Sequence, residues 1–332
     1  MQTDNRRQVW LGLLISLISL GAIFLFTDPR AIWEALQTAR YGQLAITAVG
    51  ITLFLLLRAV RWRFMLNNDV PLTTVYHIQN IGYLVTNVLP LRLGDVARAV
   101  LIGNVPPVTL ARGLSTMVVE RVLDMLFVVT VLPFTLAEVE VLPDWMQSAA
   151  RVSGILAVGA IVVLIVAANQ RPLASRIASF ILERLPMLNK EAWLRRLDDL
   201  LAGLHSLTRL REGGILIVLS IVSWLPILVS YDAALRAVHV EPTLAMTAFV
   251  FCAAAFSVAL PSSPGQIGVF HAGVFAALQI LGQPEAASAS FGFLYHAINL
   301  GSMVIWGLVG VYATGATFGK VVATTRQFMQ RG

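Results

Sequence analysis

Residues 87–98 read Asn-Val-Leu-Pro-Leu-Arg-Leu-Gly-Asp-Val-Ala-Arg, and residues 260–265 read Leu-Pro-Ser-Ser-Pro-Gly. Both contain Leu-Pro with a glycine four residues after the proline, Pro90 with Gly94 and Pro261 with Gly265, at an offset of 171 residues. The same offset carries the apolar segment that begins near 43 onto one near 214, and the segment near 114 onto one near 285. The agreement of these flanking segments predicts an internal repeat, covering about 43–140 and 214–311.

The composition predicts that lipid is the solvent for most of this chain. Of its 332 residues, 57% are hydrophobic and only 13% are charged, which no soluble domain of this size needs to build a core. A spanning helix needs about 20 mainly apolar residues. We therefore expect an all-α membrane protein with a single transmembrane domain over 1–332. The apolar stretches lie at about 8–26, 43–57, 114–136, 150–168, 214–231, 243–260 and 285–318, with shorter ones at 72–89 and 266–281.

The distribution of positive charge predicts the topology, because cytoplasmic loops carry an excess of Lys and Arg. The acidic loop near 137–149 is expected outside, whereas both chain ends and the loop at 169–213 are expected in the cytoplasm. The net charge of +6 is thus distributed by side of the membrane, as in a multi-pass protein of the cell membrane, and no nucleic-acid partner is expected. Leucines from Leu194 to Leu210 predict an amphipathic helix that lies on the inner membrane surface or packs against the protein's base. The first apolar stretch is expected to be a retained signal anchor.

The same charges predict that the two copies of the repeat are inverted. The segment at 43–57 ends at Arg58 in the cytoplasm, whereas the segment at 214–231 starts beside Arg209 and Arg211 and runs outwards. The pieces at 58–113 and about 242–284 must then each leave one face and return to it as re-entrant hairpins. We expect about six full spans and two hairpins, or seven or eight spans by plain hydropathy. Broken helices at a repeat interface are how many transporters build a site at the membrane midplane.

The first hairpin has a basic turn around Pro90 and Gly94. Asp95 and Arg98 are three residues apart and can pair on one helix face, whereas Arg92 has no acidic neighbour at that spacing. A guanidinium fork and the free N–H groups of a helix N-terminus match phosphate oxygens. Arg92 is therefore the predicted phosphate ligand; the alternative is a hairpin tip that lies at the cytoplasmic interface.

Glu120, Arg121 and Asp124 lie about seven residues into a predicted span. Each charged residue costs roughly 2.5–3.5 kcal/mol at mid-bilayer, whereas each Leu, Val or Phe returns only about 0.3–0.6 kcal/mol. The three residues must therefore face the protein interior and be paired. We expect Arg121 to pair with Asp124, leaving Glu120 for Arg92, Arg98 or a substrate amine. A purely structural ion-pair network is the alternative.

The second hairpin is polar but uncharged. Pro264 and Gly265 interrupt the helix after Pro261, and Ser262 and Ser263 offer hydroxyls. The next half-helix, which follows Gly268, points its N-terminus at this turn, so the sequence predicts an anion cradle without charge or, alternatively, a plain loop.

A polar cluster of His271, Tyr295, His296 and Asn299 is predicted beside the second hairpin. These residues lack the carboxylate or Cys spacing of a metal site, and no nucleophile or P-loop lysine accompanies them, so neither a metal nor another cofactor is expected. Cys252 is expected to be a small buried residue. Trp62, among Arg58, Arg61 and Arg63, is expected to be an interfacial anchor.

At these residues the chain resembles the lysylphosphatidylglycerol synthase transmembrane family of flippase-like membrane proteins. The resemblance covers nearly the whole chain and is carried by 58–62, 87–98, Glu120-Arg121 with Asp124, and the Pro-Gly-x-x-Gly-Val-Phe motif at 264–270. It implies a unit that flips an aminoacylated phospholipid between leaflets, joined in the namesake proteins to a soluble aminoacyl-transfer domain. The present sequence continues only a few residues past its last predicted span, so lipid synthesis is not expected. His271 and His296 stand where the family pattern has Glu and Arg.

We therefore expect a flippase and not an enzyme, with a cavity that takes the headgroup of a phospholipid or another phosphate-bearing lipid while the tails stay in the bilayer. The alternatives are a membrane-embedded lipid-modifying enzyme and a small-solute or ion transporter, and a homo-oligomer is compatible with the sequence. The predicted substrate-binding residues are Arg58, Arg61, Asn87, Arg92, Asp95, Arg98, Glu120, Arg121, Asp124, Ser262, Ser263, Gly265, Gly268, His271, Tyr295, His296 and Asn299, with turns at Pro90, Gly94, Pro261 and Pro264.

Overall fold

The computed structural model describes residues 29–88, 93–137, 148, 152, 155, 159, 170–183, 210–258 and 264–315. All regular structure within these ranges is helical. Three of the described helices are long and apolar enough to cross a membrane, Tyr41–Met65, Arg211–Ala237 and Glu285–Thr314. The predicted class, an all-α polytopic membrane protein, is confirmed. The predicted span at 8–26, nearly all of that at 150–168, and the residues Pro90, Arg92, Pro261, Ser262 and Ser263 lie outside the described residues.

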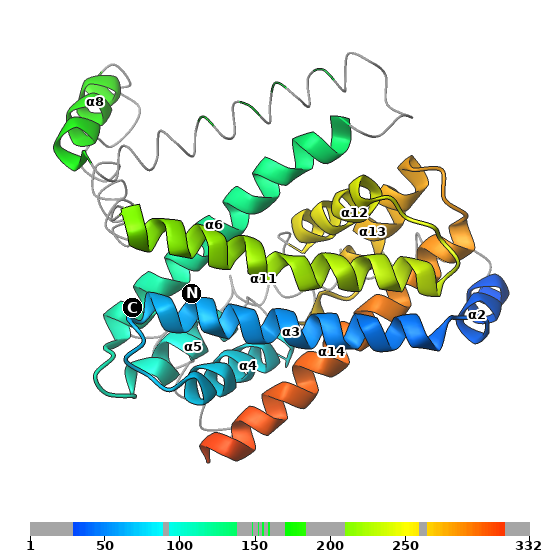
Figure 1. Cartoon of the computed structure of the whole chain (residues 1–332), viewed down its shortest axis with the longest axis horizontal. Coiled ribbons are helices and arrows are strands. Elements are labelled where there is room, and N and C mark those ends of the chain that lie inside the picture. The colour runs from blue at the N-terminus through cyan, green and yellow to red at the C-terminus, as the bar shows by residue number, and fades with distance from the viewer. Residues whose placement is uncertain are drawn as a thin grey trace, which may run out of the picture.

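The described helices form two series with the same order of lengths (Figure 1). The first series has 25, 17, 10 and 28 residues, and the second has 28, 14, 12 and 30. At about 1.5 Å per residue, only the outer helices of each series exceed the hydrocarbon thickness of about 30 Å. The series are α3 (Tyr41–Met65), α4 (Leu72–Val88), α5 (Gly94–Gly103) and α6 (Leu110–Ala137), then α11 (Leu210–Ala237), α12 (Leu244–Ser257), α13 (Val269–Ile280) and α14 (Glu285–Thr314).

The packing of the two series is mirrored. The long helices α3 and α11 run side by side along the molecule (Figure 1). The short helix α4 packs on α5 and α14, and correspondingly α12 packs on α13 and α6. The first helix of each short pair therefore lies against the last long helix of the other series. Outside this arrangement, α2 (Pro29–Gln37) packs on α14, and α8 (Arg171–Glu183) lies at the periphery.

Local signals at the helix ends place the two hairpins. The Thr243 hydroxyl accepts a hydrogen bond of 3.2 Å from the Met246 N–H, which starts α12. The one-turn helix η2 (Pro264–Gln266) interrupts the path to α13, with Gly265 at φ 72°. The carboxyl-terminal part of α4 contacts η2, so the turn of the second hairpin meets the end of the first helix of the other hairpin.

Two sequence expectations near the end of α3 are wrong. Arg58 and Arg61 do not follow the span, because α3 continues through both of them to Met65, and both side chains are buried. Trp62 is not an interfacial anchor: it is fully buried, and its indole N–H donates to the Thr116 hydroxyl at 2.9 Å. Hydropathy ends a span at the first charges, whereas this helix has buried partners for them. Cys252 is buried in α12, as predicted.

Candidate functional site

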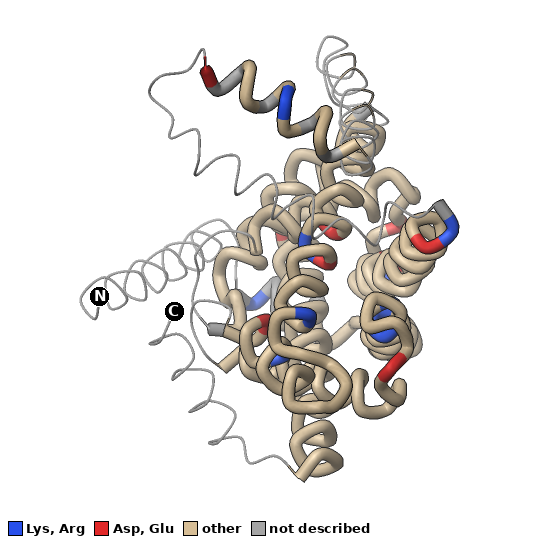
Figure 2. Tube along the Cα trace, turned by 90° about the vertical axis from the view of Figure 1, so that its left-hand side faces the viewer, with Lys and Arg blue, Asp and Glu red and all other residues tan. Residues whose placement is uncertain are grey.

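Three carboxylates and four arginines form one alternating series inside the bundle, which we call the ionic chain. In Figure 2 basic and acidic positions lie next to one another within the bundle. Each carboxylate bridges at least two guanidinium groups, since Glu120 also lies 4.0 Å from Arg61, and the series begins and ends with arginine. In order, the members are Arg61, Asp124, Arg58, Glu120, Arg98, Asp95 and Arg121. The closest N–O distances are 2.9 Å for Arg61–Asp124, 2.6 Å for Asp124–Arg58, 2.9 Å for Glu120–Arg98, 3.8 Å for Arg98–Asp95 and 2.6 Å for Asp95–Arg121, and Arg58 and Glu120 are in direct contact.

The ionic chain is built by α3, α5 and α6 from helix faces that hydropathy alone would place in lipid. Glu120 and Arg98 are almost completely buried, and the Arg61 side chain has no exposed surface. Unpaired charges at this depth would be expensive, and bridging each carboxylate twice removes most of that penalty. The expectation that Glu120 and Asp124 face the interior and are paired is confirmed, whereas Arg121 is paired but its side chain is partly exposed.

The predicted partners within this set were partly wrong. Arg121 pairs with Asp95 through Nε and Nη2, at 3.1 and 2.6 Å, and not with Asp124. Asp124 instead accepts from Arg58 and Arg61, which approach from α3. The predicted pair Asp95–Arg98 is present at 3.8 Å, but the closer partner of Asp95 is Arg121. Spacing along one helix shows which residues can meet, but a neighbouring helix offered better geometry.

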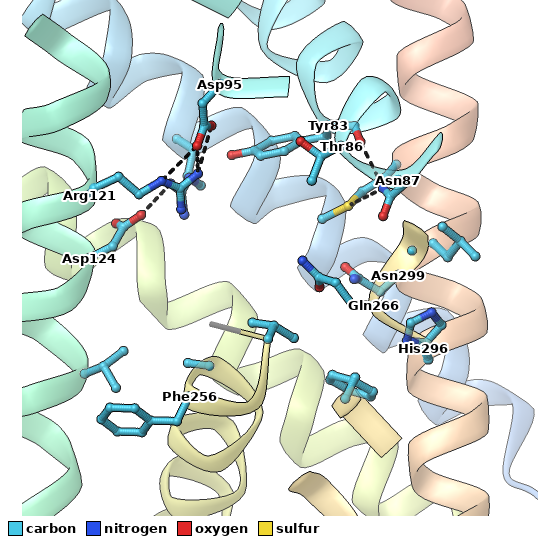
Figure 3. A pocket seen from close by; sticks show the side chains of 18 of the residues that line it. Tyr83, Thr86, Asn87, Asp95, Arg121, Asp124, Phe256, Gln266, His296 and Asn299 are labelled. Atoms are coloured by element: carbon cyan, nitrogen blue, oxygen red, sulfur yellow. Dashed lines mark hydrogen bonds and ion pairs between the residues drawn. The ribbon is translucent and has the colours of Figure 1, made fainter. Parts of the chain in front are cut away.

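A cavity of about 390 Å³ lies where the two hairpins meet, beside Arg121 at one end of the ionic chain (Figure 3). Gly265 at the second hairpin and Asn87 at the end of α4 both line it. A side chain at position 265 would lie 3.9 Å from the Asn87 carbonyl oxygen and would need the left-handed φ of 72°, which favours glycine here.

Two walls of the cavity differ in chemistry. Arg58, Asp95, Arg121 and Asp124 form one, which we call the ionic wall. Asn87, Gln266, His296 and Asn299 form the other, which we call the amide wall. Figure 3 shows Arg121 and Asp124 on one side and Gln266 and Asn299 on the other.

The ionic wall presents unused donors to the cavity. The Arg121 side chain is 41% exposed, and its Nη1 makes no hydrogen bond within the described part of the chain. The Tyr83 hydroxyl points towards the Asp95–Arg121 pair and also has no hydrogen-bond partner among the described residues (Figure 3). A ligand that accepts several hydrogen bonds and carries negative charge fits this corner.

One side of the cavity is apolar and open. Met125 and Val129 of α6 and Phe256 of α12 line it, and their exposed fractions are 63%, 44% and 46%. Exposed apolar side chains on the helices of a membrane protein suit contact with lipid tails more than contact with water.

The predicted polar cluster is only partly assembled. The His271 and His296 rings lie 4.8 Å apart between centroids, and the Gly268 N–H donates to His271 Nδ1 at 3.3 Å. Tyr295 turns away into an aromatic core, where its hydroxyl lies 3.4 Å from the Ser230 hydroxyl. Of the four, His296 and Asn299 line the cavity.

Sequence reasoning missed Tyr83, Gln266 and Trp224, which all line the cavity. Tyr83 lies one helical turn before Asn87 and so shares its face of α4, a signal that was present. Gln266 lies within the motif at 264–270 but carries no charge to draw notice. The roles of all predicted site residues stay predictions, and Arg92, Ser262 and Ser263 lie outside the described residues.

Comparison with known proteins agrees along nearly the whole chain. Residues 9–307 match the family described as the lysylphosphatidylglycerol synthase transmembrane region. A UPF0104 membrane protein of Methanothermobacter thermautotrophicus is 26% identical over 323 residues, which cover 93% of this chain and 92% of that protein. No solved structure matches the chain.

Proposed function

Because the chain belongs to the lysylphosphatidylglycerol synthase transmembrane family, we propose that it is a lipid flippase, and not an enzyme, that moves a phosphate-bearing lipid between the leaflets of the cell membrane. The observation that carries this proposal is the excess positive charge of the ionic chain, which is exposed at a cavity with one apolar and open side. Moving an ionic headgroup through hydrocarbon is costly because its hydration is lost. The cavity walls replace that hydration.

The ionic chain carries one positive charge more than its carboxylates neutralise, which suits the binding of one anion. Four arginines face three carboxylates, and both terminal positions are arginines. The Arg61 end is closed, since its Nη1 donates to the Ser220 hydroxyl at 3.3 Å and its side chain is fully buried. The Arg121 end is open to the cavity. A phosphate there would accept from Arg121 and from the Tyr83 hydroxyl and would continue the alternation of charge.

The mirrored packing supports transport by an inverted repeat. Two series with the same order of helices, each with the first helix of its short pair against the last helix of the other, are the arrangement expected of inverted halves. In this proposal both short pairs are re-entrant hairpins whose turns meet near the membrane midplane. Rocking of one half against the other would then expose the cavity to each leaflet in turn.

Flipping of a fluorescent phosphatidylglycerol in reconstituted vesicles tests the proposal. Arg121→Gln should lower the flipping rate by about tenfold or more, and Tyr83→Phe by less, because a charged donor contributes more than a hydroxyl. The double variant Asp95→Asn with Arg121→Gln is the matched control, since it removes the carboxylate that Arg121→Gln leaves with only its longer contact to Arg98. It should recover stability and stay inactive.

The proposal is overturned if the double variant flips lipid at the wild-type rate while remaining folded. Two measurements separate the alternatives. A chemically altered lipid in mass spectrometry of the vesicle lipids would indicate a membrane-embedded enzyme. Release of a small ion trapped in the vesicles, without lipid movement, would indicate a solute transporter.

Arg92 remains a second proposed phosphate ligand. In the sequence it lies between the residues of α4 and those of α5, two residues before Gly94. If it hands the phosphate to Arg121, flipping should fall in the order Arg, Lys, Gln at position 92, because Lys keeps the charge but loses the guanidinium fork. An Arg92→Gln variant that is folded and fully active would make this residue an interfacial anchor only.

A further inference from the structure

The amide wall has polar groups without partners. The side chains of Gln266 and Asn299 make no hydrogen bond within the described part of the chain, and His296 Nε2 is buried without a partner there. The Asn87 amide N–H donates to the Tyr83 carbonyl at 3.0 Å, which leaves its oxygen unused. A buried polar atom is normally hydrogen-bonded, so His296 Nε2, together with half-buried amides that have no partner among the described residues, indicates a polar ligand in this cavity. Amides suit hydroxyls, which also donate and accept.

The backbone at Gln266 makes the same point independently. Gln266 has φ 60°, between Gly265 at 72° and Gly268 at 91°. Glycine adopts this left-handed conformation readily, whereas a residue with a side chain is strained in it. Strained backbone of this kind concentrates at ligand sites. The turn itself does not need the glutamine, whose amide points into the cavity (Figure 3).

Among the described residues, the cavity lining offers no free carboxylate to an ammonium group. Asp95 and Asp124 line it, but each is already shared by two arginines. Glu120 is likewise held between Arg58 and Arg98. The connecting stretches 89–92 and 259–263 contain no Asp or Glu in the sequence. An aminoacylated, cationic headgroup would therefore lie beside surplus arginine charge without a counter-ion.

Resting on the proposed flippase activity, we propose that the substrate is an anionic phosphodiester lipid whose headgroup ends in an uncharged polyol, such as glycerol or a sugar, and not an aminoacylated lipid. The phosphodiester binds at Arg121 on the ionic wall. The hydroxyls beyond it bind Gln266 and Asn299 on the amide wall.

Three fluorescent lipids with identical tails test the substrate class in vesicles that contain the wild-type protein. Phosphatidylglycerol carries both the anion and the hydroxyls, phosphatidylmethanol carries the anion alone, and lysylphosphatidylglycerol carries a net positive headgroup. We expect phosphatidylglycerol to flip about tenfold faster than phosphatidylmethanol. Phosphatidylmethanol leaves the hydrogen bonds of the amide wall unmet, which lowers the affinity of the cavity for that lipid. Lysylphosphatidylglycerol should move no faster than in protein-free vesicles.

Two variants separate recognition of hydroxyls from a loss of structure. Gln266→Gly removes the amide and suits the left-handed turn, and Asn299→Leu replaces the other amide with a side chain of similar size. Both should bring the ratio of phosphatidylglycerol to phosphatidylmethanol rates towards one. Arg121→Gln should slow both anionic lipids and leave their ratio unchanged.

The outcomes are distinct. If lysylphosphatidylglycerol flips as fast as phosphatidylglycerol, this inference is overturned and the flippase stands. A ratio that stays near tenfold in both amide variants overturns the amide wall as the recognition site. If none of the three lipids moves faster than in protein-free vesicles, the proposed function fails and this inference with it.

Discussion

The two halves of the molecule close the same architecture with different chemistry. At the offset of 171 residues, Phe291 and Tyr295 of α14 take the positions that Glu120 and Asp124 have on α6. Glu120 contacts arginines of α3 and α5. On α14, Tyr295, at the position of Asp124, contacts a ring of α11 at 4.2 Å and a ring of α13 at 5.8 Å between centroids. One half is joined by ions and the other by aromatic rings.

The aromatic half shows that helix packing does not require the ions. Rings enter a bilayer readily, whereas each charged residue costs roughly 2.5–3.5 kcal/mol at its centre. A network that is expensive and dispensable for packing is best explained by what it binds.

Replacing the ring by a carboxylate in the aromatic half should have the largest effect. Phe291→Glu would bury a charge among Tyr231 and Tyr295, whose rings lie 5.8 Å away, without a basic residue among these contacts. We expect no folded protein by size-exclusion chromatography in detergent, since an unpaired buried charge is among the most destabilising changes. Phe291→Leu, the control, should lose less than about 1.5 kcal/mol. A folded Phe291→Glu protein would show that either half can hold ions and would remove the contrast.

Neutralising one carboxylate in the ionic half should come next. Glu120→Gln leaves Arg58 and Arg98 with less compensation, and breaking a buried pair costs about 3–5 kcal/mol. The measurement is thermal unfolding in detergent. Asp69→Asn, which breaks a partly exposed pair with Arg112, is the control and should cost at most about 1 kcal/mol. Equal losses in the two variants would mean that the ionic chain is no more than a set of surface pairs.

The close helix contacts within the two hairpins should differ more modestly. A methyl group on Gly82 would meet the stem of Arg98 and the Gly94 carbonyl, whereas one on Gly273 would meet the Ser257 side chain. Overpacking of this kind costs about 1–3 kcal/mol. Gly82→Ala should also slow lipid flipping, because Arg98 holds Glu120 in place. Gly273→Ala should be rescued by adding Ser257→Ala, and slower flipping in that double variant would contradict the division of roles.

The smallest effect is expected at the ion pair on α11. Asp232 and Arg236 lie 2.7 Å apart, four residues apart on one helix, with about a third of each side chain exposed. Ion pairs as exposed as this one contribute little to stability, so Asp232→Asn should change the melting temperature only slightly. A loss comparable to that of Glu120→Gln would show that the second half also depends on charge.

The sequence predicted the short helices well and the end of α3 poorly. Proline and glycine mark the turns of the hairpins, so the stretches predicted at 72–89 and 266–281 agree with α4 and α13 within a few residues. Arg58 and Arg61 looked like the end of a span, because hydropathy scores each residue without its partners. Their partners, Glu120 and Asp124, lie on another helix.

The site itself was predicted in composition more than in arrangement. The penalty for burying Glu120 and Asp124 required partners, and partners are present. Which arginine each carboxylate would take depends on how α3 and α5 approach α6, and spacing along one helix does not contain that information. Gln266 escaped notice for a related reason: its meaning comes from Asn299, which only the fold brings to the same cavity.

The ionic chain also bears on how the protein is made. Arg58, Arg61 and Arg98 all precede Glu120 and Asp124 in the sequence, so a ribosome delivers the basic partners first. When α6 leaves the insertion machinery, the groups that neutralise its carboxylates are already in the membrane. Helix α6 would therefore insert poorly by itself and more readily once α3 and α5 are in place. Its insertion would depend on tertiary packing as much as on its own hydropathy.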